Sequence, residues 1–236
     1  MKSMPLSAEK ERIRKDVDAI LHGKMSRYES LLMLPSTPPK LLSLGLRNLP
    51  ILMSQGHVRN CLTPKGENPK FHGIKKDAFI DLIDDLFAPT IVMESLTDRK
   101  SIVVITDKMD EDHNPILISM KLNGHGQYKL RHLDSNYITS VYGKDRFVNF
   151  IRRCQKQKKI LYIDHKKIQG LECFASLQLA GNCSNLESIN RLKEQCHFVK
   201  PPVNVGIRAT IETNKEKAAT KEPTKPSKER AIGKDR

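Results

Sequence analysis

Four apolar segments between Pro89 and Lys144 decide the fold. In order they read Pro89-Thr-Ile-Val-Met-Glu-Ser95, Ser101-Ile-Val-Val-Ile-Thr-Asp107, Pro115-Ile-Leu-Ile-Ser-Met-Lys121 and Tyr137-Ile-Thr-Ser-Val-Tyr-Gly-Lys144. Ile, Val and Thr favour strands, and the Asp, Asn, Gly and Pro residues between the segments favour tight turns. Three or four strands with one covered face can support a domain. The stretch therefore predicts a small antiparallel sheet.

Helical spacing of apolar residues predicts that the residues before Pro89 cover this sheet. Ile13, Val17 and Ile20 form one stripe of a helix over 8–22 that ends at Gly23. A second stripe predicts a helix over 74–87, which Pro89 ends. Shorter elements are expected nearby: a helix over 40–44 capped by Thr37, an edge strand over 49–53 that begins with Leu49-Pro50, and a helix from Ser54 through Cys61.

The two connections around the third strand read as turns. The acidic residues 110–114 predict a solvent-facing turn, and Asn123-Gly-His-Gly126 predicts a turn into a short strand over 128–132. After the sheet, we expect a helix over 144–156, a strand over 159–163 and a helix from 165 towards 179 that Asp164 caps.

These patterns define an α+β fold, with N-terminal helices packed on a small antiparallel β-sheet, a helical C-terminal extension and a disordered basic tail. The tail is rich in Lys, Glu, Pro and Thr, a composition that does not form a core. The expected parts are an N-terminal helical segment at 1–34, an α+β domain at 35–180, a helical or irregular extension at 181–212 and the tail at 213–236.

The charge balance favours a polyanionic partner, with nucleic acid as the first candidate. The net charge is +14, and the tail from Thr213 to Arg236 contributes eight Lys or Arg against four acids. Ten of the fourteen excess positive charges therefore belong to the part expected to fold.

Several protein classes lack their signals in this sequence. The five cysteines include no Cys-x-x-Cys pair, so reduced thiols are expected and neither a disulfide framework nor a metal site. No apolar run is long enough for a membrane span, and the charged N-terminus is unlike a signal peptide, which predicts a cytoplasmic protein without a membrane partner. Phosphate-binding glycine loops and the common hydrolase motifs are missing, so no cofactor is expected.

The residues that remain for chemistry are His72, Ser140, Tyr142 and Lys144, with His57 and Arg99 as additional candidates. Ser140 and Tyr142 lie two residues apart and would share one face of a strand. A histidine from the loop before the 74–87 helix would add an acid or base. The alternative is that the two hydroxyl residues are ordinary strand positions and that His72 bonds only to backbone.

Such a set suits RNA cleavage by the ribose 2′-OH, in which a base, an acid and cations act on one phosphate. Basic residues that would follow the RNA backbone are Arg99, Arg152, Arg153, Lys156, Lys158, Lys159, Lys166 and Lys167. A solvated helix face explains most of these residues equally well.

At these residues the sequence resembles a known group of domains. The motifs that carry the resemblance, in order, are Thr37-Pro38, Leu44-Gly-Leu46, Leu49-Pro-Ile51, His72-Gly-Ile74, Ala88-Pro89, Glu94-Ser95, Val103-Val-Ile-Thr-Asp107 and Ser140-Val-Tyr-Gly-Lys144. From about Ser36 to Ile163 the chain is similar to the phage MuF C-terminal domain and to the phage barnase–EndoU–colicin–RelE-like (BECR fold) nuclease group. The resemblance implies an α+β domain of a mobile element that cleaves RNA without a metal, and it places His72, Ser140 and Tyr142 in matching motifs.

Two hypotheses follow. In the first, the chain is a metal-independent endoribonuclease acting on tRNA or another structured RNA. In the second, it is a non-catalytic accessory module of a phage or mobile element, which binds nucleic acid or a host or phage protein through its basic surface.

Overall fold

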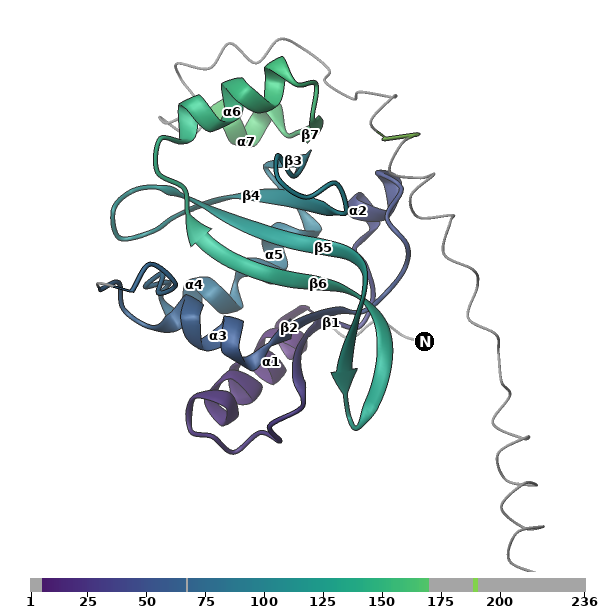
Figure 1. Cartoon of the computed structure of the whole chain (residues 1–236), viewed down its shortest axis with the longest axis vertical. Helices are drawn as coiled ribbons and strands as arrows, with labels where there is room; N and C mark the ends of the chain where they lie inside the picture. Colours follow the sequence, from purple (N-terminus) through teal and green to yellow (C-terminus); the bar gives the residue numbers. More distant parts are fainter. Residues whose placement is uncertain (1–5, 67, 170–188, 191–236) are drawn as a thin grey trace, which may run out of the picture. The chain divides into compact units, whose positions relative to one another are not determined.

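The computed structural model describes residues 6–66, 68–169 and 189–190. They form an α+β fold in which a seven-stranded sheet has the order β1-β2-β6-β5-β4-β3-β7 (Figure 1). The strands are β1 (Ser30–Leu34), β2 (Ile51–Ser54), β3 (Ile91–Glu94), β4 (Ser101–Met109), β5 (Pro115–Tyr128), β6 (Arg131–Gly143) and β7 (Ile160–Ile163). The helices are α1 (Leu6–Leu21), α2 (Pro39–Ser43), α3 (Gln55–Leu62), α4 (Lys76–Ile80), α5 (Leu82–Phe87), α6 (Phe147–Lys156) and α7 (His165–Gln169).

The alternation of side chains along the strands divides the core into two layers. On β4, Ile102 and Val104 pack with residues of α1 to α5, whereas Val103 and Ile105 pack with residues of α6 and α7. The first layer extends across all seven strands, but the second reaches only from β7 to Leu117 of β5. The helices of the second layer therefore leave β6 uncovered on that face.

Ion pairs join the N-terminal helix α1 to the α4–α5 segment. Lys10 of α1 contacts both Asp81 and Asp84, and Lys76 contacts Asp18. The helix is longer than expected by two residues at its start and ends one residue before His22, and Gly23 takes the left-handed conformation (φ +67°).

The sheet is mixed, so the prediction of a purely antiparallel sheet was wrong. Strand β2 pairs antiparallel with β1 and parallel with β6. Strand β1 was not expected at all and lies within the segment 1–34. A four-residue apolar run does not indicate the direction of its neighbour, and for this reason the parallel pair was missed.

The expectation that residues 49–53 form an edge strand, which rested on Pro50, was also wrong. Strand β2 lies inside the sheet, and Pro50 stands just before it, where its carbonyl accepts a bond from the Asn136 amide (2.9 Å). A proline at this position deprives the ladder of no donor.

The predicted turn at Asn123–Gly126 is instead part of β5, which continues to Tyr128 and pairs with β6 in a long hairpin. The turn lies at Lys129 and Leu130, both with positive φ. Position 126 of the strand takes a glycine because a side chain has little room there: a Cβ would lie 2.5 Å from Leu52 Cδ1 and 3.1 Å from the Tyr137 ring.

Other details differ locally. The helix expected over 74–87 is divided into α4 and α5 at Asp81. Thr37 caps no helix, since its hydroxyl donates to the carbonyls of Arg47 and Leu49 and accepts from Asn136. Asp164 does cap α7, accepting from the amides of Lys166 and Lys167. The end of the 165–179 helix, most of the 181–212 extension and the 213–236 tail lie outside the described residues.

Candidate functional site

The C-terminal part of β6 offers a free strand side on which a site can be built. Strand β2 pairs with β6 only at residues 136–138, so residues 139–143 have β5 on one side and no strand on the other. Helix α3 and the loop after it lie along that side, where Cys61 Sγ donates to the Val141 carbonyl (3.4 Å). A β-bulge at Thr139 interrupts the pairing with β5, and bulges of this kind often reorient side chains beside active sites.

The loop that carries His72 is fixed by backbone hydrogen bonds. The amide of His72 donates to the Asn60 carbonyl, that of Gly73 to Thr63, and that of Ile74 to Cys61. Gly73 has φ +62°, a conformation that glycine adopts without strain. The loop thus returns to the end of α3 and presents His72 next to β6.

The structure brings His72, Ser140 and Tyr142 together. His72 Nε2 lies 3.5 Å from Ser140 Oγ, and the His72 and Tyr142 rings are 5.7 Å apart between centroids with a 38° tilt. Ser140 and Tyr142 pair with Ser119 and Leu117 on β5, and Leu117 belongs to the layer beneath α6. Both hydroxyl side chains therefore lie on the α6 side of the sheet, in the part where the helices leave β6 uncovered. We call this part of the surface the open face. Their catalytic role remains a prediction.

A cleft of about 410 Å³ opens beside this group. It is lined by His57, Asn60, Cys61, Pro69, Lys70, His72, Thr139 and Ser140. His57 faces the same cleft as His72, but its Nδ1 is buried without a hydrogen-bond partner among the described residues. Burial lowers the pKa of His57, and the nearby Ile138 carbonyl opposes this effect.

The surroundings of His72 favour the neutral form of its imidazole. Partial burial lowers its pKa below the ordinary value, and the positive charge of Lys65 lowers it further. A neutral imidazole has one unprotonated ring nitrogen, which can accept a proton.

Lys65 is held beside His72 by a buried carboxylate. Lys65 Nζ donates to Asp110 Oδ2 (2.8 Å) and also pairs with Asp112. The Asp110 carboxylate is fully buried and accepts from the amides of Asp112 and Asn114. Although burial alone would raise its pKa, these bonds, chiefly that from Lys65, leave the pKa of Asp110 lowered. The turn at 110–114 is therefore a structural anchor for the His72 loop.

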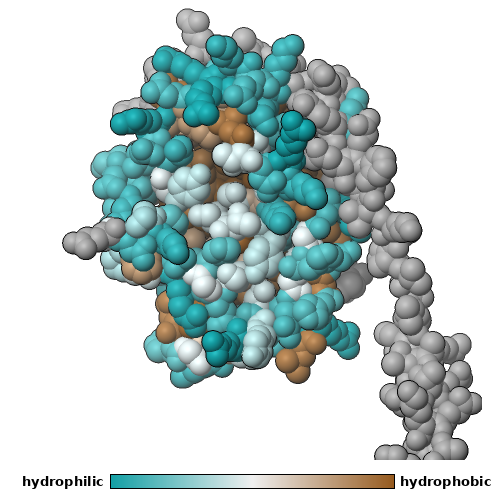
Figure 2. All heavy atoms as spheres, in the orientation of Figure 1, coloured by the Kyte–Doolittle hydropathy of each residue, from teal (hydrophilic) through white to brown (hydrophobic). Residues whose placement is uncertain are grey.

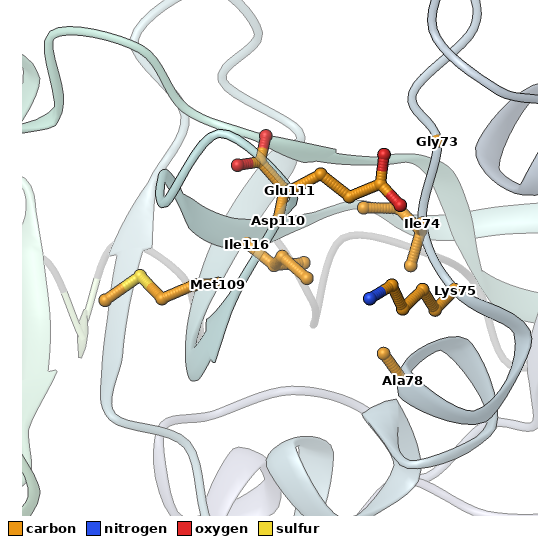
Figure 3. Close-up of a pocket in the computed structure, with 8 residues that line it drawn as sticks. All are labelled: Gly73, Ile74, Lys75, Ala78, Met109, Asp110, Glu111 and Ile116. Atoms are coloured by element: carbon orange, nitrogen blue, oxygen red, sulfur yellow. The ribbon is translucent and has the colours of Figure 1, made fainter.

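A small pocket of about 80 Å³ lies on the side of this anchor. Figure 3 shows its lining, with Gly73 and Ile74 contributed by the loop and Asp110 and Glu111 by the turn. It is too small for a nucleotide, since ligand pockets typically occupy ~300 Å³ or more. Asp110 also packs against Gly143 at the end of β6, where a Cβ would lie 1.9 Å from Asp110 Oδ2.

Lys144 follows β6 and points to the face that α6 covers. Its Nζ lies 3.2 Å from Asp145 Oδ1 and 5.7 Å from the centroid of the Phe150 ring on α6. Lys144 is thus a partly exposed cation two residues after Tyr142, already paired with an exposed carboxylate.

Weakly polar side chains continue the site across the open face. Thr139 Oγ1 donates to the Ser119 carbonyl (3.3 Å) and lies 3.2 Å from Ser119 Oγ. Tyr137, Thr139, Ser140 and Tyr142 are all half-buried. Figure 2 shows pale, weakly polar residues gathered across the middle of this face, surrounded by hydrophilic ones.

The predicted RNA-backbone residues lie mainly on α6, around β7 and on α7, beside the covered part of the face. Within this set, Lys159 donates to the Ser95 carbonyl (2.8 Å), and Lys167 pairs with Asp107 (3.2 Å). Lys158 stands in the turn before β7 with φ +54°. Arg99 lies in the β3–β4 connection. The exposed residues of the set are Arg99, Arg152, Arg153, Lys156, Lys158 and Lys166.

Sequence reasoning missed Lys65, Asp110, Ser119 and Thr139. The glycines next to the site were the available signal, because Gly73 and Gly143 stand where Lys65 and Asp110 make close contacts. Their partners, however, are distant in the chain, and only the folded structure identifies them.

Comparison with known families bears on the C-terminal part of the described structure. Residues 65–170 match the family described as the phage MuF-C-terminal domain. The match confirms the MuF part of the resemblance and covers less than half of the chain, from the His72 loop through α7. The family description names no nuclease activity. No curated protein and no solved structure matches the chain significantly.

Two kinds of feature are absent from the described residues. None of the described helices combines the length and apolar character that crossing a bilayer requires. Within the same residues, His, Cys, Asp and Glu side chains form no cluster of three that could ligate a metal.

Proposed function

We propose that this chain contains a phage- or mobile-element-derived RNA-cleaving domain that works by acid–base catalysis. The observation that carries the proposal is the convergence of His72, Ser140 and Tyr142 at a cleft on the open face of the sheet. The match of residues 65–170 to a phage domain supports the mobile-element origin.

In this proposal the neutral His72 removes the proton from a ribose 2′-OH. The 2′-oxygen attacks the adjacent phosphorus, the bond to the 5′-oxygen breaks, and that oxygen leaves with a proton. The products are a 2′,3′-cyclic phosphate and a 5′-hydroxyl. The leaving 5′-oxygen takes its proton from protonated His72 or from water, and in the second case His72 later gives its own proton to water. No step of this scheme requires a metal.

The neighbouring side chains would stabilise the charge that develops on the phosphate. Ser140 and Tyr142 each carry a hydroxyl that can donate to a non-bridging oxygen, and Lys144 supplies a positive charge at the end of the strand. Donors fixed on a strand are already oriented before the reaction, which is the condition for effective stabilisation.

Two variants test the proposal with one matched control. The parent protein, His72→Ala and Tyr142→Phe are incubated with tRNA and with total RNA in EDTA, and the RNA ends are analysed for cyclic phosphate. We expect the parent to cleave RNA and both variants to lose cleavage while they still bind RNA. In His72→Ala, which lacks the general base, the cleavage rate should fall by about 100-fold or more. His132→Ala, which removes an exposed histidine near the tip of the β5–β6 hairpin, is the control and should cleave like the parent.

The alternative is a non-catalytic module that binds nucleic acid or a host protein through a basic surface. The exposed Arg152, Arg153 and Lys156 of α6 favour it. Folded parent protein that cleaves none of the RNAs, with both variants binding RNA as the parent does, would establish this reading instead.

A further inference from the structure

A second cleft adjoins the one at His72. It has a volume of about 540 Å³, within the range of pockets that hold small organic ligands. The two clefts meet along α3 and β6: Gly56 lines the second and His57 the first, and Tyr137 lines the second whereas Thr139 and Ser140 line the first. The residues that line the second cleft include Arg27, Tyr28, Glu29, Gly56, Arg59 and Tyr137.

The loop that forms one wall of this cleft is held by a buried side chain. Gln55 Nε2 donates to the carbonyls of Ser26 (2.6 Å) and Glu29 (2.8 Å), and Gln55 is only 7% exposed. Arg59 Nη2 adds bonds to the Ile20 carbonyl and to Gln55 Oε1. The loop after α1 is thus anchored to α3 on both sides of Tyr28.

On this anchored loop, Tyr28 is 73% exposed, which packing does not explain. A large aromatic side chain in solvent, at the rim of a cleft, is a common means of stacking a nucleobase. Tyr137 supplies a second aromatic ring to the same cleft, and its ring lies over the side-chain-free Gly126 of β5.

The charges of the lining fit a nucleotide. Arg27 is exposed beside Tyr28 and can contact a phosphate, whereas Nη2 of Arg59 already donates to the Ile20 carbonyl and to Gln55. Glu29 would oppose a phosphate but can accept hydrogen bonds from the amino or imino groups of a base. Gly56 leaves the start of α3 without a side chain at the cleft.

We propose that this cleft is a nucleotide subsite, in which a base of single-stranded RNA stacks on Tyr28 and its phosphate contacts Arg27, next to the nucleotide cleaved at His72. The inference rests on the proposed function, since it assigns the neighbouring part of the same RNA substrate. Its lining comes almost wholly from residues before 65, outside the segment that matches the phage domain.

The test uses the full chain and a probe that cannot be cleaved. A short single-stranded 2′-O-methyl oligoribonucleotide of mixed sequence, labelled with fluorescein, is titrated with the parent and with variants, and the affinity is read by anisotropy. Stacking on one aromatic side chain supports a loss of about 5- to 150-fold in Tyr28→Ala. Tyr28→Phe keeps the ring and should bind like the parent. Arg27→Ala should weaken binding and reduce the slope of log K against log salt by about 0.7.

Two control variants match these changes elsewhere on the surface. Phe87→Ala removes another exposed aromatic side chain, and Lys75→Ala another exposed cation; both should leave the affinity unchanged. Equal affinity of Tyr28→Ala and the parent, or no binding of the probe by the parent, would overturn the subsite. Failure of the RNA-cleavage assay with Tyr28-dependent binding intact would instead reject the catalytic proposal and leave the subsite standing.

Discussion

Replacing Asp85 by asparagine should stabilise the protein relative to the parent, and this gain should be larger at neutral pH than at pH 4. Asp85 lies on α5 against β4, is 1% exposed and is paired with Lys108 of β4. Burial raises the pKa of this carboxyl from the ordinary 3.8 to about 6, although the bond and charge of Lys108 act in the opposite direction.

The sign follows from the raised pKa. The folded state holds the proton more tightly than the unfolded state, so the contribution of Asp85 to stability is fully present below about pH 4 and is lost as the pH rises through 6. One pKa unit corresponds to about 1.4 kcal/mol, so a change from 3.8 to about 6 corresponds to about 3 kcal/mol. Asparagine cannot ionise, and the Asp85→Asn variant therefore escapes this loss.

The assay is urea unfolding of the parent and of Asp85→Asn at several values from pH 4 to pH 8. The free energy of unfolding of the variant, minus that of the parent, should increase by about 3 kcal/mol over this range. Glu111→Gln, which changes an exposed carboxylate with no ion pair among the described residues, is the matched control and should show a nearly constant difference. If the free energies of unfolding of the parent and of Asp85→Asn changed with pH in parallel, the reasoning would be refuted. Burial would then not make the Asp85 carboxyl harder to ionise.

Three further predictions concern the site and the core. Lys65→Met should raise the pKa of His72 towards its ordinary value while burial keeps it below, which NMR titration of the imidazole resonances measures; an unchanged or lower His72 pKa would show that Lys65 does not act on it. Gly126→Ala should destabilise the protein by about 1–3 kcal/mol, because the new methyl meets Leu52 and Tyr137, whereas Gly66→Ala meets nothing within 4 Å; similar unfolding curves for both would contradict the crowding. Burial raises the pKa of Cys61 to about 12 and of Cys154 to about 11, so both thiols should react with DTNB only on unfolding, and fast labelling of either in the folded protein would contradict their burial.

Local sequence patterns predicted most of the strands and helices. The segments beginning at Pro89, Ser101 and Pro115 are strands because β-branched residues follow each other there with turn residues between them. Helix α6 and strand β7 also formed near their expected positions. In these segments the local preference and the buried environment agree.

The pairing of the strands could not be predicted in the same way. The parallel contact of β2 with β6 joins residues more than eighty positions apart, and no short-range pattern specifies it. Gly124 and Gly126 are typical of a turn, yet both pair with β6 within β5, and at Gly126 Leu52 and Tyr137 occupy the space that a side chain would need. Tertiary packing outweighed the local preference of these glycines.

The candidate site was only partly visible in the sequence. The spacing of Ser140 and Tyr142 places them on one face of a strand, and His72 ends a loop of suitable length. What brings them together is the short pairing of β2, which frees the side of β6, and the bulge at Thr139. The Lys65–Asp110 anchor and the Tyr28 cleft depend on contacts between distant segments, which a single sequence does not reveal.

The most direct test of the central claim is the cleavage of one mapped RNA with and without the 2′-OH at the cleaved nucleotide, in EDTA. The account predicts that the all-ribose RNA is cut to a 2′,3′-cyclic phosphate, that a single 2′-deoxy substitution at that nucleotide abolishes the cut, and that His72→Ala cuts neither. Cleavage of the 2′-deoxy RNA at the same position, or undiminished cleavage by His72→Ala, would contradict it.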